Sequence, residues 1–246
     1  MAVFLRLGCG ENFLSTIDPS AATSVLPTFD PQLIPVDGVD FHLPAVSLSA
    51  LCPDALRCRF ASPPQWEPEV HSEPSFLSSL PLRASVLIPI VMRDRPSVLL
   101  TERTKHLSSH SGQIAFPGGK ADKDDASPVA TALRETFEEI GLPASFVQVL
   151  GELPLYVTGS AFLITPVVAL VRPGFTLVLN DFEVADAFEV PLDFLMNPSH
   201  HQRHSFEWEG VRREWFSMPY QDQSVQRYIW GATAGMLRNF YRMLSA

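Results

Sequence analysis

The residues best suited to chemistry in this chain are three carboxylates near its middle, Glu135, Glu138 and Glu139. On a helix, Glu135 and Glu139 would form an i, i+4 pair of like charges, which costs about 0.2–0.5 kcal/mol. Glu138 and Glu139 would also lie at the negative end of the helix dipole, at a cost of about 0.3–1 kcal/mol each. A solvated acidic face explains this poorly, whereas Mg²⁺ would remove both penalties, because it prefers carboxylate oxygens and shares its shell with substrate phosphates. The cluster therefore predicts a metal site for phosphate chemistry.

The helix that carries these acids has clear ends in the sequence. Ser127 is a favourable N-cap, Pro128 suits the first helical position, and Gly141 suits the left-handed residue that closes a helix. We therefore expect a helix over residues 128–140, with the three acids facing outward. Its core-facing side is expected to consist of Val129, Leu133, Thr136, Phe137 and Ile140.

The glycine pair before this helix and the acids within it together resemble the Nudix box. That pattern is Gly, five residues, Glu, seven residues, then Arg-Glu-x-x-Glu-Glu-x-Gly. The chain departs from it twice, because Asp125 replaces the Glu and eight residues separate Asp125 from Arg134. Residues 99–119 resemble the segment that marks the coenzyme A pyrophosphatase branch of the family, which has the same Asp and the same extra residue. The combined resemblance covers residues 99–142, with Thr104 where Ser is usual.

The resemblance implies an α/β fold, a Nudix-type α/β/α sandwich with a mixed sheet. It also implies an Mg²⁺- or Mn²⁺-dependent hydrolase that converts coenzyme A or acyl-coenzyme A to 3',5'-ADP and (acyl-)4'-phosphopantetheine. Two alternatives stay open: hydrolysis of another nucleoside diphosphate derivative, such as ADP-ribose or a dinucleotide, and a non-catalytic Nudix domain that senses a nucleotide. The sensor is disfavoured because all three acids are present and no DNA-binding helix pair or basic tail accompanies them.

Roles in the site follow from the same resemblance and from the charges. Glu135 and Glu139 are expected to bind the metal with the Gly119 carbonyl, and Glu138 to complete the shell or to act as the base. Glu183, in the loop of residues 180–186, is a candidate to approach the metal or to activate water, and a plain solvated acidic loop is an equal alternative.

The neighbouring basic and polar residues have separate roles. Arg134 lies about 100° from Glu135 on the helical wheel, so we expect it to point away from the metal and to brace the loop through Asp125. The candidates for substrate contact are Arg103, His110, Gln113 and Lys120.

Two of those candidates have a purely structural interpretation as an alternative. Gln113 could instead satisfy backbone groups, and Arg103 could form a surface ion pair worth about 0–1 kcal/mol. Zinc is not expected, because the histidines lack a compact spacing and a Cys pair. His200 and His201 are read as surface loop residues.

Composition limits the classes of partner and compartment. The chain has 246 residues and a net charge of -9, which argues against a nucleic-acid binder. The partner that the resemblance implies is a small nucleotide substrate similar to coenzyme A. Three cysteines match no zinc motif and suggest reduced thiols. Residues 1–10 are too short an apolar run for an export signal or a membrane span. We expect a cytoplasmic protein without a membrane partner.

The chain divides by texture into a Pro-rich N-terminal extension, residues 1–82, and a Nudix domain, residues 83–246. The extension is expected to contain one helix over residues 45–52 and an extended arm over residues 62–74. We expect it to pack on the catalytic domain or to contribute to a homodimer interface, rather than to carry a separate activity.

The second part alternates between strands and helices. Strands are expected over residues 85–91 and 97–101 as a hairpin, then over 113–116, 146–155 and 162–171. A second hairpin over residues 206–216 turns at 209–210, and a core-facing helix is expected over residues 229–244.

Overall fold

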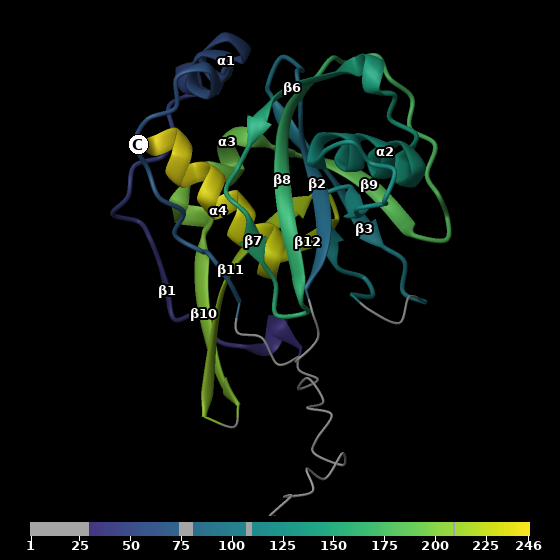
Figure 1. Cartoon of the computed structure of the whole chain (residues 1–246). Coiled ribbons are helices and arrows are strands. Elements are labelled where there is room, and N and C mark those ends of the chain that lie inside the picture. The colour runs from purple at the N-terminus through teal and green to yellow at the C-terminus, as the bar shows by residue number, and fades with distance from the viewer. Residues whose placement is uncertain (1–29, 74–80, 107–109, 209) are drawn as a thin grey trace, which may run out of the picture.

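The computed structural model describes residues 30–73, 81–106, 110–208 and 210–246 (Figure 1). Its larger sheet has the strand order β4-β3-β2-β8-β6, with β5 paired to β2, β7 to β8 and β9 to β3. The central pair, β2 and β8, is parallel, and the other paired strands are antiparallel. The bounds are β2 Leu82–Val91, β3 Ser97–Arg103, β4 Ile114–Ala115, β5 Gly118–Lys120, β6 Val147–Glu152, β7 Tyr156–Val157, β8 Phe162–Val171 and β9 Val184–Pro191.

Helices cover both faces of this mixed sheet, as the predicted α/β/α sandwich requires. Side chains alternate between the two faces of a strand, so in β2 Leu87 packs against Ala132 of α2 (Pro128–Ile140). Its neighbour Ile88 joins the larger core cluster with Phe240 of α4 (Gly231–Ser245). The fold class and the first hairpin, β2 with β3, are confirmed.

Helix α2 has the predicted ends, because the Ser127 hydroxyl accepts from Ala130 N at 3.1 Å and Gly141 has φ 67°. The predicted faces were wrong at two residues. Phe137 is 57% exposed, and Glu139 is only 4% exposed. Helix α2 packs Ala132 against the sheet, and Glu139 lies on its buried side, where it accepts from Gly118 N of the glycine loop.

A second sheet, with the order β1-β10-β11-β12, packs against α4 through β11 and β12. Its strands are β1 Gly38–Val39, β10 Gln202–Trp208, β11 Val211–Asp222 and β12 Val225–Trp230. The predicted second hairpin is confirmed as β10 and β11, with position 209 outside the described residues. The predicted helix over residues 229–244 begins too early, because Ile229 pairs with Met218 in the sheet and α4 starts at Gly231. Ile229 lies three residues before Ala232, so this buried strand residue has the spacing expected of one more helical residue.

The N-terminal extension contains α1 (Pro53–Ala61), so the helix predicted over residues 45–52 was wrong. A 3-10 turn, Leu48–Leu51, lies there instead. Pro53 occupies the first helical position, where its missing N–H costs nothing, and it begins the helix rather than breaking it. The remaining short helices are Pro31–Leu33, Ala144–Phe146, α3 Leu192–Leu195 and Pro198–His200.

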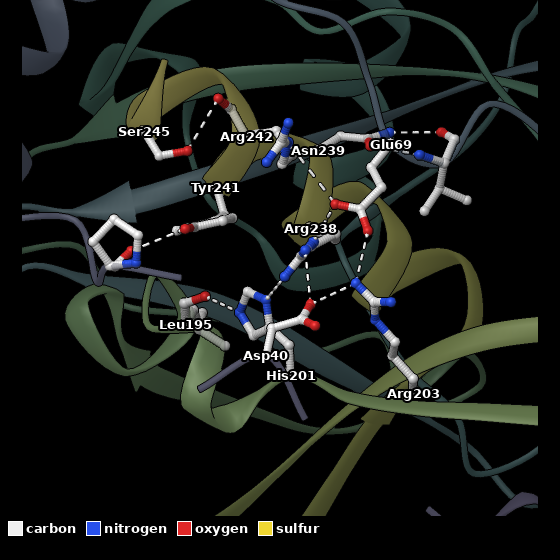
Figure 2. A network of polar contacts seen from close by, with 12 residues as sticks. Asp40, Glu69, Leu195, His201, Arg203, Arg238, Asn239, Tyr241, Arg242 and Ser245 are labelled. Atoms are coloured by element: carbon white, nitrogen blue, oxygen red, sulfur yellow. Dashed lines mark hydrogen bonds and ion pairs between the residues drawn. The ribbon is translucent and has the colours of Figure 1, made fainter. Parts of the chain in front are cut away.

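The described extension shares the main core. Leu51 and Leu56 belong to the same buried cluster as α4, and buried polar contacts join the two (Figure 2). Arg238 of α4, 1% exposed, contacts Asp40 at 2.8 Å and Glu69 at 2.7 Å. The division of the chain into residues 1–82 and 83–246 stays a prediction.

Two histidines lie in this region and were predicted wrongly as surface loop residues. His201 is fully buried, with Nε2 2.7 Å from the Leu195 carbonyl and Nδ1 3.2 Å from an Arg238 nitrogen. Because the guanidinium only donates, Nδ1 accepts and Nε2 carries the proton. His200 lies half-buried in the short 3-10 helix and stacks on Phe194 at 4.0 Å.

Candidate active site

The glycine loop is brought to helix α2 by strand β5, whose residues Gly118 and Gly119 pair with Val86 and Ser85 of β2. Both glycines are required by close contacts. Gly118 has φ 152°, and a Cβ there would lie 2.4 Å from the Ser85 carbonyl oxygen. A Cβ at Gly119 would lie 2.5 Å from Oε2 of Glu135. The backbone of Gly119 therefore lies directly against a carboxylate of the acidic helix.

Glu139 is the innermost acid of the site. Its Oε2 accepts from Gly118 N at 3.0 Å, and its Oε1 lies 3.8 Å from Nη1 of Arg103. The pKa of Glu139 is raised to about 7, mainly by burial and to a lesser extent by the nearby charges of Glu183 and Glu135. The Gly118 N–H and Arg103 oppose that rise. Glu139 therefore binds a proton more tightly than an ordinary carboxylate does.

Glu135 and Glu138 lie further outward on the same helix. Burial raises the pKa of Glu135, whereas its hydrogen bond from Arg134 lowers it. Nη1 of Arg134 lies 2.9 Å from Oε1 of Glu135 and 3.0 Å from Oε2 of Glu138. The Glu138 side chain is 55% exposed and open to solvent.

Arg134 also binds Asp125 through two nitrogens, at 3.0 and 2.8 Å, and donates to the Lys120 carbonyl at 3.1 Å. The predicted contact with Asp125 is thus present, and it holds the pKa of that carboxyl well below its usual range. The expectation that Arg134 points away from the metal edge of the helix was wrong, because it also contacts Glu135 and Glu138 there. Its planar group has five donors, so one edge binds the loop while Nη1 reaches the carboxylates.

Glu183 lies in the turn before β9, close enough that its charge raises the pKa of both Glu135 and Glu139. Its carbonyl accepts from Thr104 N at 3.0 Å. The structure therefore brings Glu183 to the other acids.

Of the substrate-contact candidates, Arg103, His110 and Gln113 are linked to one another, and Lys120 lies apart beside Phe162. Arg103 faces Glu139, and its backbone N donates to the Gln113 carbonyl at 3.0 Å. His110 Nδ1 lies 2.9 Å from Oε1 of Gln113, so these two side chains form one unit. The Lys120 ammonium lies 5.8 Å from the centre of the Phe162 ring, and this residue is exposed.

Two contributors were missed by the sequence reasoning. The Gly118 N–H supports Glu139, and the Thr104 hydroxyl holds the Glu183 turn by donating to the Phe182 carbonyl at 2.9 Å. A backbone donor leaves no side-chain signal. The sequence shows the hydroxyl at position 104, but its partner lies 78 residues away.

The donor set suits a hard divalent cation. In the described part of the chain, no three His, Cys, Asp or Glu side chains are grouped as a ready metal site. Mg²⁺ does not need three, because it usually takes one or two carboxylates and keeps several waters. Glu135, Glu139 and the adjoining Gly119 backbone offer such oxygens, and Arg134 and Arg103 partly neutralise the carboxylates.

Comparison with known proteins identifies the family. A family model described as the NUDIX domain matches residues 81–217. The chain belongs to the Nudix hydrolase family. A relative from Yersinia pestis (strain Pestoides F), named "Uncharacterized Nudix hydrolase NudL", is 42% identical over 170 residues, covering 69% of this chain and 83% of the relative. A Yersinia pseudotuberculosis serotype O:1b protein of the same name matches equally.

Solved Nudix structures overlap with part of the chain. RenU, a Nudix hydrolase from M. smegmatis, is 26% identical with a TM-score of 0.39, covering 49% of this chain and 76% of its own. A C. elegans Ap4A hydrolase is 18% identical with a TM-score of 0.39, covering 46% and 81%. The family assignment rests on the sequence matches.

Family membership makes this Nudix protein an enzyme, a pyrophosphohydrolase, and Nudix hydrolases generally use divalent metal cations. Among the described helices, none has the length and apolar character needed to cross a membrane.

Proposed function

We propose that this Nudix hydrolase cleaves the pyrophosphate of coenzyme A or acyl-coenzyme A, with Mg²⁺ or Mn²⁺, to give 3',5'-ADP and (acyl-)4'-phosphopantetheine. The substrate choice is supported by residues 99–119, which resemble the coenzyme A branch. The observation that carries the proposal is that this segment ends at the acids, with Arg103 Nη1 3.8 Å from Glu139 and its backbone bonded to Gln113.

The reaction needs charge neutralisation and an oriented water. When bound, the metal ion would neutralise the phosphate oxygens and activate water; Glu135, Glu139 and the Gly119 carbonyl would hold it. Glu138 or Glu183 accepts the proton of the attacking water.

The surrounding cations complete the proposed site. Arg103 and Lys120 bind phosphate oxygens, while His110 and Gln113 orient the substrate. Arg134, fixed by Asp125, keeps the helix and the glycine loop together. We place the enzyme in the cytoplasm and leave a homodimer open.

The decisive experiment compares coenzyme A, acetyl-coenzyme A, ADP-ribose and a diadenosine polyphosphate with Mg²⁺ and with Mn²⁺, and identifies the products by mass. We expect 3',5'-ADP and phosphopantetheine as the preferred products. Faster hydrolysis of ADP-ribose or the dinucleotide would assign another nucleoside diphosphate derivative. Binding without hydrolysis of any of them would indicate a nucleotide sensor.

A further inference from the structure

Phe182 is a large aromatic side chain that the turn before β9 displays to solvent, with 79% of the residue exposed. Single exposed apolar residues are common on protein surfaces, and Phe41 is similarly exposed at 75%. Exposure alone therefore says little about Phe182. Phe182 differs from other exposed apolar residues in the hydrogen bonds that hold its turn and in its location beside the acidic site.

The turn that carries Phe182 is held by hydrogen bonds on both sides. Asn180 N donates to the Glu139 carbonyl at 2.8 Å, and Asn180 in turn accepts from Phe182 N at 3.2 Å and from Glu183 N at 2.9 Å. Thr104 donates to Phe182 O through its hydroxyl and to Glu183 O through its backbone. The ring is thus presented on a fixed backbone that is bonded to the end of α2 and to the end of β3.

Its position is at the edge of the acidic site. The residue after Phe182 is Glu183, whose charge acts on Glu135 and Glu139. The residue bonded to its carbonyl is Thr104, the neighbour of Arg103. The turn that displays this exposed ring is thus bonded to Thr104 and to the end of the acidic helix. An aromatic ring beside a charged site suits a ligand that combines phosphates with a flat aromatic part.

We propose that Phe182 is the surface on which the nucleobase of the substrate stacks. This inference rests on the proposed function, because it assumes a substrate that carries a nucleobase on its pyrophosphate. Base and aromatic rings stack favourably whatever the base, and a ring on a fixed backbone loses little freedom on binding. Phe182 is accordingly a specificity residue that favours nucleotides over diphosphates without a base.

The test measures inhibition by each product separately, on coenzyme A hydrolysis by the full chain. In Phe182→Ala, the inhibition constant of 3',5'-ADP should rise about tenfold, which corresponds to about 1.4 kcal/mol, and that of 4'-phosphopantetheine should stay unchanged. Phe182→Tyr should retain the wild-type constants. Phe41→Ala is the matched control, because it removes an equally exposed ring from the extension and should change neither constant.

Equal inhibition constants in Phe182→Ala and wild type would overturn the proposal. If they are accompanied by a changed sedimentation coefficient, Phe182 is a contact between protein chains. A second measurement does not depend on turnover: AMP should quench the added fluorescence of Phe182→Trp, and ribose 5-phosphate should not. If coenzyme A is not hydrolysed but AMP quenches, the coenzyme A proposal fails while the stacking surface stands; if AMP does not quench, stacking fails.

Discussion

At the scale of single residues, the site depends on a buried carboxylate. Glu139 is 4% exposed and pairs with Gly118 N and, more distantly, with Arg103. Burial raises its pKa to about 7, from an ordinary value of 4.5. If Glu139 holds the divalent cation, as we propose, the cation competes with a proton at this residue, and the competition should be visible near neutral pH.

Glu139→Gln should nearly abolish hydrolysis while the fold remains, because it removes a proposed metal ligand and keeps an oxygen that can accept from Gly118 N. The thermal midpoint without metal should hold or rise, since like-charge repulsion on the helix falls. The measurements are kcat at saturating Mg²⁺ and Tm in EDTA, with Glu152→Gln as an exposed control. Wild-type turnover in Glu139→Gln would contradict the metal assignment.

The same residue predicts a pH dependence. Because its folded pKa is raised, the metal-free fold gains from a bound proton at low pH and loses that stabilisation as pH rises from about 4.5 to about 7. Mg²⁺ affinity should increase over the same interval, because binding displaces the proton. Urea unfolding in EDTA and Mg²⁺ titrations at several pH values test both effects. Glu139→Gln should lose the two slopes, and slopes that persist in it would assign them to another group.

Arg103→Lys should lower kcat/KM on coenzyme A by about tenfold or more if Arg103 binds a phosphate through two nitrogens, because Lys lacks the planar fork. Gln113→Ala is compared alongside, and both variants are assayed on coenzyme A and on the form lacking the 3'-phosphate. Arg93→Lys, which alters an exposed ion pair with Glu189, is the control. Unchanged kcat/KM for both substrates in both variants would move the specificity determinants elsewhere.

At the scale of elements, the site is made where β5 meets α2. The pairing of β5 with β2 fixes the glycine loop, and the packing of α2 on β2 and β8 fixes the acids. The two glycines of β5 divide these tasks, since Gly118 faces the backbone of β2 and Gly119 faces a carboxylate of α2.

Gly119→Ala should therefore impair activity far more than stability, because its Cβ would displace only the flexible end of Glu135. Gly118→Ala should destabilise the fold by about 1–3 kcal/mol, since its Cβ meets backbone and its φ is strained for alanine. Urea unfolding and kcat/KM of the two variants separate these effects. Equal losses of stability in both would show that Glu135 cannot yield.

At the scale of the whole molecule, the described N-terminal extension is joined to the catalytic core through α4. Asp40 and Glu69 of the extension both form ion pairs with Arg238 (Figure 2). His201, the residue just before β10, contacts the same arginine. Desolvation lowers the pKa of His201 to about 4, so this histidine is neutral beside the arginine at physiological pH.

Arg238→Met should destabilise the protein by about 3 kcal/mol, near the lower end for removing one partner of a buried ion pair, because Arg203 still binds Asp40. Arg242→Met, at a 43% exposed position on the same helix, should cost no more than about 1 kcal/mol. Urea midpoints measure both. Equal midpoints for the two variants would show that the extension is not held by this contact.

The sequence by itself determined the features that depend on neighbours in the chain. Ser127 begins helix α2 through a local hydrogen bond, and Gly141 closes it with a left-handed φ. The three acids on this helix were identified from the motif alone. The apolar run of residues 162–171 likewise sufficed to predict β8. Such signals are complete within a few residues, so they survive without knowledge of the fold.

Only the tertiary structure decided which side chains are buried and which residues distant in the chain come into contact. Glu139 is buried and Phe137 exposed because of the face that α2 turns toward β2 and β8, which includes Ala132. The approach of Arg103 and Glu183 to that acid, and of Arg238 to Asp40, joins residues far apart in the chain. Burial and long-range contact depend on how elements pack, and no local pattern of residue types specifies that packing.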